Sequence, residues 1–155
     1  MAFLSQLEGK GHASVYFHHQ INACSMTIFS KLIAGDIPAY TIAESDKFFA
    51  FLDIFPCTPG HTLVVPKMET DRLFDLPDDF LAEYLGFCKP IANAIKTAFD
   101  ADRVNMLTLG FEVPHCHIHL IPMNGMDDFT FLDKIKQTPD ELAAAQQKIL
   151  DAMGK

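Results

Sequence analysis

The chain has 155 residues, 49% of them apolar, and a formal net charge of −8 at pH 7. This length fits a single domain, and the apolar content is enough to build a substantial core. Affinity for DNA or RNA comes largely from lysine and arginine side chains that neutralise phosphates, so the acidic balance argues against a nucleic-acid partner. A small nucleotide is compatible with this charge, because backbone N–H groups and imidazoles can bind its phosphates.

Cysteine spacing and the length of the apolar runs indicate the cellular compartment and whether the chain enters a membrane. The chain has four cysteines, and none of them forms a Cys-x-x-Cys pair. This pattern argues against a disulfide framework and against a cysteine zinc site. No apolar run approaches the roughly 20 residues of a membrane span. We therefore expect a cytoplasmic protein with no membrane partner.

The first 25 residues differ from the rest of the chain. They carry scattered histidines and show no helical or strand period. We expect a disordered N-terminal extension over residues 1–25, followed by a domain over residues 26–155. The first helix of this domain is predicted near residues 27–34, because apolar residues recur there at helical spacing and Gly35 can end the helix.

Three strands are predicted after this helix. Tyr40–Ala43 and Phe48–Leu52 are expected to pair antiparallel through a turn at residues 44–46. A loop rich in turn residues then leads into His61–Val65, where β-branched residues favour a strand. The sequence therefore predicts an antiparallel pair followed by one further strand.

The second half of the domain alternates helix and strand. One apolar face predicts a long helix between Pro77 and Phe99, which Pro90 should bend. Two further strands are expected over Val104–Leu109 and Val113–Ile121, with a tight connection around Gly110 between them.

A terminal helix is predicted from about residue 139. Thr138 supplies the N-cap, Pro139 the first helical position and Glu141 the acidic residue of a capping box. With the preceding elements, this helix predicts an α+β domain.

Three histidines alternate along the last predicted strand. Side chains in a strand point to opposite faces in turn, so His115, His117 and His119 should share one face. Cys116 and Ile118 should point the other way, toward the core. The sequence therefore predicts a surface lined by three imidazoles.

Two kinds of chemistry suit such a surface. Histidines on one face can hold a divalent metal ion with an open position for water, which would make a metallohydrolase. No carboxylate lies inside the run, and this favours the other interpretation, in which a neutral imidazole attacks phosphorus and forms a covalent intermediate. On that interpretation neighbouring imidazoles stabilise the phosphate oxygens, and neither a metal nor a cofactor is needed.

The motifs together resemble the histidine triad (HIT) family of nucleotide hydrolases and transferases. The resemblance covers roughly residues 27–122 in the family's order and spacing, and it rests on these segments: Ile28-Phe29, Ile33–Pro38, Asp53-Ile54, Pro59–Lys67 and Pro114–His119. It implies a homodimer of the HIT-like α+β fold, in which helices flank an antiparallel sheet and a purine nucleotide or nucleotide conjugate lies across that sheet.

The resemblance also implies roles for particular residues. His117 is the family's nucleophile and forms a nucleotidyl-histidine intermediate, His119 contacts the α-phosphate, and His115 and His61 support the phosphate pocket. The ribose contact falls on Asp53. The contacts to the purine faces fall on Ile37, Phe51 and Ile54.

The chain departs from the family pattern at two places. Many members carry a Cys-x-x-Cys zinc pair where this chain has Thr27 and Ser30, so the resemblance implies that this structural zinc is missing. The loop before the histidines, residues 104–112, is shorter than in other members. Gly110 and Glu112 of this loop are further candidates for nucleotide contacts. Glu112 is expected either to protonate the leaving group or to point out of the site, because a carboxylate beside an anionic phosphate costs energy.

The function favoured by the sequence is a nucleoside phosphoramidase or a related nucleotidyl hydrolase, with adenosine nucleotides favoured by the resemblance. A dinucleoside polyphosphate hydrolase is the nearest alternative among enzymes. A nucleotide-binding regulatory protein with little turnover is the alternative from another class, because the shortened loop could have cost the protein its activity.

Overall fold

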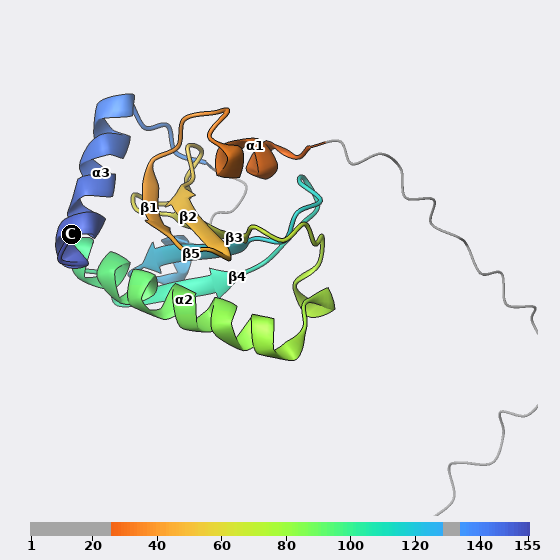
Figure 1. The fold of residues 1–155 in the computed structure, drawn as a ribbon. Coiled ribbons are helices and arrows are strands. Elements are labelled where there is room, and N and C mark those ends of the chain that lie inside the picture. Colours follow the sequence, from red (N-terminus) through yellow and green to blue (C-terminus); the bar gives the residue numbers. More distant parts are fainter. Residues whose placement is uncertain (1–25, 129–133) are drawn as a thin grey trace, which may run out of the picture.

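The computed structural model describes residues 26–128 and 134–155. Within these residues, five strands form one antiparallel sheet in the order β1-β2-β3-β5-β4 (Figure 1). The strands are β1 (Thr41–Glu44), β2 (Phe48–Leu52), β3 (Thr62–Pro66), β4 (Arg103–Leu107) and β5 (Ile118–Met123). The helices are α1 (Ile28–Ala34), α2 (Asp78–Ala98) and α3 (Pro139–Ala152), with short 3-10 helices η1 (Leu73–Asp75) and η2 (Met126–Asp128).

The predicted α+β class, with helices flanking an antiparallel sheet, is therefore confirmed. The predicted N-terminal extension at residues 1–25 lies outside the described residues. Within the described part of the chain, no helix combines the length and the apolar character that crossing a membrane requires.

Local sequence signals set the ends of two helices. The Thr27 side chain caps α1 by accepting a hydrogen bond from the Ser30 backbone N–H, and Gly35 ends the helix in the left-handed conformation with φ +80°. Thr138 and Glu141 form the predicted capping box at the start of α3. α1 therefore ends at the predicted glycine, and α3 begins at its predicted cap.

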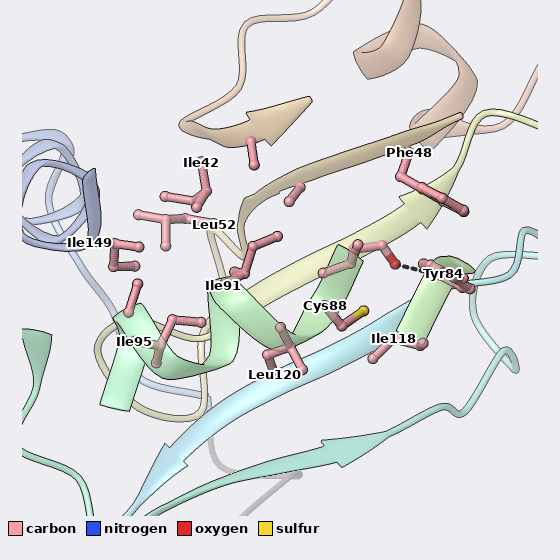
Figure 2. Close-up of a cluster of buried hydrophobic side chains, with 14 of the residues drawn as sticks. Ile42, Phe48, Leu52, Tyr84, Cys88, Ile91, Ile95, Ile118, Leu120 and Ile149 are labelled. Carbon is pink, nitrogen blue, oxygen red and sulfur yellow. Dashed lines mark hydrogen bonds between the residues drawn. The ribbon is translucent and has the colours of Figure 1, made fainter. Parts of the chain in front are cut away.

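Two apolar layers cover the two faces of the sheet. Figure 2 shows the larger cluster, in which α2 and α3 pack against the sheet. Its labelled members are Ile42, Phe48, Leu52, Tyr84, Cys88, Ile91, Ile95, Ile118, Leu120 and Ile149. On the opposite face, Phe29 of α1 packs on Phe49 and Phe51 of β2. Residues of β2 are thus buried on both faces, which fixes α1 against the sheet.

The predicted connection between the last two strands is wrong. β4 ends at Leu107 and β5 begins at Ile118, so the connection runs over residues 108–117 instead of turning tightly at Gly110. The backbone N–H of Cys116 donates to Thr70 O (2.6 Å) rather than to β4, and Pro114 has no N–H to donate. Consequently two of the three histidines precede the strand, and only His119 lies in it.

Candidate active site

A pocket of about 550 Å³ opens between α1, the ends of β2 and β3, and the connection over residues 108–117. Its volume is in the range of small-molecule sites. Its lining includes all six residues that the sequence proposes for nucleotide contacts, namely Ile37, Phe51, Asp53, Ile54, Gly110 and Glu112. His117 and His119 also line it. The folded chain thus brings residues that are distant in sequence, from Ile37 to His119, together in one pocket.

The other two candidate histidines lie behind this pocket. His115 and His61 are buried, and neither is part of the pocket lining. The His115 ring donates from Nε2 to the carbonyl oxygen of Pro66 (2.8 Å). The His61 ring lies 2.9 Å from His119, between Nε2 of the first and Nδ1 of the second. The four histidines therefore divide into two that face the pocket and two that contact those from behind.

A backbone hydrogen bond fixes the proton on the His117 ring. Nδ1 of His117 lies 2.7 Å from the carbonyl oxygen of His115. A carbonyl oxygen only accepts, so Nδ1 carries the hydrogen and Nε2 of the neutral ring keeps its lone pair. Burial lowers the pKa of His117 below the ordinary value of 6.5. The ring is therefore a neutral nucleophile at neutral pH, with Nε2 as its nucleophilic atom.

The tautomers of His61 and His119 follow from a chain of donors. The backbone N–H of Cys57 donates to Nδ1 of His61 (3.2 Å), so His61 carries its hydrogen on Nε2 and donates it to Nδ1 of His119. His119 then carries its own hydrogen on Nε2. Burial lowers the pKa of both His61 and His119 to about 3. The pair is neutral and offers an N–H donor from a residue that lines the pocket.

Asp53 lies at the edge of this pair. Its Oδ2 is 3.6 Å from Nδ1 of His61, too far for a hydrogen bond, and its Oδ1 accepts from the backbone N–H of Phe55 (2.8 Å). Burial raises the pKa of Asp53. The Asp53 side chain is therefore a hydrogen-bonding group held at the pocket wall.

Asp53, His61 and His119 also form the one group in the described residues that could hold a metal ion, with one ligand atom from each residue inside 4.8 Å. The carboxylate and two imidazoles suit a divalent cation such as zinc. Two nitrogens on a tetrahedral zinc ion lie roughly 3.3 Å apart, however, whereas the 2.9 Å between His61 and His119 is a hydrogen-bonding distance. Metal binding here would break the His61–His119 hydrogen bond.

Thr27 and Ser30 stand where many members of the resembled family have zinc-binding cysteines. Their hydroxyls lie 2.9 Å apart, Thr27 Oγ1 lies 3.3 Å from Nδ1 of His115, and Ser30 Oγ donates to Glu69 Oε1 (3.0 Å). Structural zinc is held by thiolates and imidazoles, and this set offers two neutral hydroxyls instead. These residues do not fit a structural zinc ion.

Sequence reasoning missed two residues of the pocket wall. Lys134 lines the pocket, with Nζ 3.9 Å from Asp53 Oδ2, because the backbone N–H of Ile135 bonds to Pro56 O (2.9 Å) and holds this segment beside the β2–β3 loop. No periodicity around Lys134 indicates that placement. Phe29 packs edge-on to the His117 ring, with centroids 5.0 Å apart. Its place on the apolar face of α1 predicted burial but not this contact.

Comparison with known proteins assigns the family. Residues 34–126 match the HIT domain. The chain belongs to the histidine triad family. A relative named protein hit, from Bacillus subtilis, is 39% identical over 106 residues, which is 65% of this chain and 73% of the relative. The adenosine 5'-monophosphoramidase HNT1 of Saccharomyces cerevisiae is 38% identical over 96 residues, 61% of each chain.

Solved structures of histidine triad proteins share the fold. A Hit-like protein involved in cell-cycle regulation from Bartonella henselae superposes with a TM-score of 0.72 at 35% identity, covering 81% of this chain and 95% of the other. A zinc-bound histidine triad family protein from Mycobacterium smegmatis gives a TM-score of 0.70 at 31% identity, covering 82% and 92%. Both results agree with the antiparallel sheet and flanking helices of this chain.

Proposed function

We propose that this histidine triad protein is a hydrolase that acts at the α-phosphate of a purine nucleotide conjugate, with phosphoramidates as the favoured class. The observation that carries the proposal is the hydrogen bond from Nδ1 of His117 to His115 O (2.7 Å), which leaves Nε2 as the nucleophilic atom of a residue lining the pocket. The name of the yeast relative, an adenosine 5'-monophosphoramidase, supports the substrate class.

In the first step, the lone pair on Nε2 of His117 attacks the α-phosphorus. A nitrogen–phosphorus bond to His117 forms, the bond from phosphorus to the leaving-group nitrogen breaks, and the departing amine takes up a proton. The N–H on His119 donates to a non-bridging oxygen as negative charge builds there. The His115 carbonyl stabilises the positive charge that develops on the His117 ring through the Nδ1 hydrogen bond.

In the second step, water attacks the nucleotidyl-histidine. The new oxygen–phosphorus bond replaces the bond to Nε2, the nucleoside monophosphate leaves, and the proton of the water is released to solvent. His117 returns to its neutral form because burial keeps its pKa below the ordinary range. One difficult displacement is thereby divided into two easier ones.

The rest of the pocket suits a nucleoside. Ile37, Phe51 and Ile54 supply apolar faces for a purine, and Asp53 supplies a carboxylate for the ribose hydroxyls. Gly110 has φ +76°, a conformation that favours glycine, and lines the pocket with its backbone.

Glu112 is exposed but lines the pocket, and its charge partly opposes the lowering of the His117 pKa by burial. A bound anionic phosphate would disfavour this charge, and the carboxyl group that then carries a proton is suitably placed to supply it to the leaving amine. We propose this acid role for Glu112, in preference to a side chain directed away from the site.

Two alternatives have an observation in their favour. Lys134 adds a cationic group to the pocket, which would suit the longer phosphate chain of a dinucleoside polyphosphate. Phe111, in the shortened connection, is 94% exposed, and a connection without its usual polar groups suits a nucleotide-binding protein with little turnover. Hydrolysis of a diadenosine polyphosphate in preference to a phosphoramidate would support the first alternative, and tight AMP binding without turnover the second.

We also propose a cytoplasmic homodimer. β4 lies at the edge of the sheet in the described part of the chain, and its Met106 is exposed. An edge strand presents backbone groups that a second chain can pair with. Light scattering coupled to size-exclusion chromatography tests the dimer, and a monomeric mass at micromolar concentration would overturn it.

The experiment for the activity uses an adenosine 5'-phosphoramidate that carries a fluorescent amine, in the presence of a chelator. We expect turnover by the wild type and a loss of at least about 1,000-fold in His117→Ala, because the nucleophile is removed. AMP binding by the variant, measured by calorimetry, shows that the pocket is intact. Absence of wild-type turnover, or its loss with chelator, would overturn the proposal.

A further inference from the structure

A second polar cluster lies behind His115, outside the pocket lining. Thr27 Oγ1 lies 3.3 Å from Nδ1 of His115 and 2.9 Å from Ser30 Oγ. Ser30 Oγ in turn donates to Oε1 of Glu69 (3.0 Å), an exposed residue. The cluster therefore runs from a surface carboxylate to a buried imidazole.

His115 connects this cluster to the proposed nucleophile. Its Nε2 donates to Pro66 O (2.8 Å), and its Nδ1 lies within hydrogen-bonding distance of Thr27 Oγ1 (3.3 Å), so both ring nitrogens have a polar neighbour. The backbone carbonyl of the same residue accepts from Nδ1 of His117 (2.7 Å). A shift of the His115 backbone would move the acceptor that keeps the hydrogen on Nδ1 of His117, and the two ring contacts resist such a shift.

The hydrogens of the cluster allow the Thr27 hydroxyl to donate to His115. Ser30 uses its single hydroxyl hydrogen on Glu69, so it has none to donate to Thr27. Thr27 Oγ1 already accepts from the Ser30 backbone N–H (3.1 Å). The Thr27 hydroxyl hydrogen is then left for Nδ1 of His115 or for Ser30 Oγ.

We propose that Thr27 and Ser30, with Glu69 at the outer end, are positioning residues that hold His115 and through its carbonyl fix the proton on Nδ1 of His117. The consequence for catalysis rests on the proposed function. None of the three lines the pocket, so none is expected to bind the nucleotide.

α1 adds a packing contact to the same cluster. Phe29, two residues after Thr27, lies edge-on to both His115 and His117, with ring centroids 5.9 and 5.0 Å apart. Because Thr27 also caps α1, its replacement by valine could act through the helix as well as through His115. The test must separate these two effects.

Three variants and one control separate them. Thr27→Val keeps the size of the side chain and removes its hydroxyl, whereas Thr27→Ser restores both the cap and the donor. Ser30→Ala removes the link to Glu69 at a helical position where alanine is the best helix former. Thr138→Val is the matched control, because Thr138 is the hydroxyl cap of α3 and is not part of the pocket lining.

The measurement is NMR of protein with ¹⁵N-labelled histidines, together with kcat and KM for the phosphoramidate. In Thr27→Val we expect faster exchange of the His117 Nδ1 proton with water and a kcat roughly tenfold lower at unchanged KM, less than the about 100-fold cost of a 1 Å misplacement. Ser30→Ala should show the same changes to a smaller extent. Thr27→Ser should match the wild type.

Thr138→Val should lower the melting temperature and leave both His117 exchange and kcat unchanged. The proposal is overturned if Thr27→Val leaves the His117 proton as in the wild type, or if Thr138→Val changes it equally. Absence of wild-type turnover would overturn the proposed function but not the positioning role, because the NMR comparison tests that role without any substrate.

Discussion

Nε2 of His61 and Nδ1 of His119 lie 2.9 Å apart in a site where burial lowers the pKa of both rings to about 3. The pair is therefore neutral at any pH at which the protein is expected to work, and its hydrogen bond orients the N–H that His119 offers. A neutral donor pair of this kind can support a phosphate without the cost of a buried charge.

The same pair makes stability depend on pH. In the unfolded chain both histidines titrate near 6.5, whereas in the folded protein they stay neutral down to about 3. The unfolded state alone binds these protons as the pH falls from 6.5, so the full stability is present above pH 6.5 and declines below it, by up to about 1.4 kcal/mol per pH unit for each histidine.

Urea unfolding between pH 7.5 and 5 measures this decline. The double variant His61→Asn/His119→Asn is the comparison and should show a shallower loss over the same range. A wild-type free energy of unfolding that stays constant from pH 6.5 to 5 would contradict the assignment of two buried neutral histidines.

Gly60 and Gly35 give a matched pair for backbone strain. Both have positive φ, +88° and +80°, but a Cβ on Gly60 would lie 2.6 Å from Cδ2 of Phe99, whereas a Cβ on Gly35 meets nothing within 4 Å. We expect Gly60→Ala to cost about 2–4 kcal/mol and Gly35→Ala about 1 kcal/mol. Chemical denaturation measures both, and equal losses would show that Phe99 moves aside without cost.

The sequence predicted the elements whose signals are local. Thr138 with Glu141 placed the start of α3, and the apolar run Phe48–Leu52 has the bounds of β2. In both cases the residues that make the signal also make the contacts, a cap in one and a strand buried on both faces in the other.

The connection before His117 could not be predicted in this way. Alternation of His115, His117 and His119 suggested a strand, but the backbone of Cys116 bonds to Thr70 and so leaves the β4 ladder. This partner is distant in sequence and carries no pattern. Lys134 was missed for a related reason, since Ile135 bonds to Pro56 far along the chain and brings Lys134 to the pocket wall.

Replacing Glu112 by glutamine tests the proposed acid. Burial lowers the pKa of His117 and the charge of Glu112 partly opposes this, so removal of the charge should lower that pKa further and move the acid limb of the rate profile to lower pH. If Glu112 also protonates the leaving amine, kcat for conjugates of strongly basic amines should fall about 100-fold. Rates are measured from pH 4.5 to 9 with one basic and one weakly basic leaving group.

Unchanged rates of Glu112→Gln across this range would rule out the acid role and leave Glu112 as a residue directed away from the reaction. Asp128→Asn is a suitable control, because Asp128 bonds to backbone N–H groups at Asn124 and Gly125 and does not line the pocket. The rates of Asp128→Asn should show the same pH dependence as those of the wild type.

The central claim, a covalent intermediate on His117, is tested most directly by the stereochemistry at phosphorus. An adenosine 5'-phosphorothioamidate of known configuration is hydrolysed by the protein in ¹⁸O-labelled water, with a chelator present, and the configuration of the product is determined. Two successive in-line displacements predict retention of configuration. Inversion would mean that water attacks phosphorus directly, and it would contradict the assignment of His117 as the nucleophile.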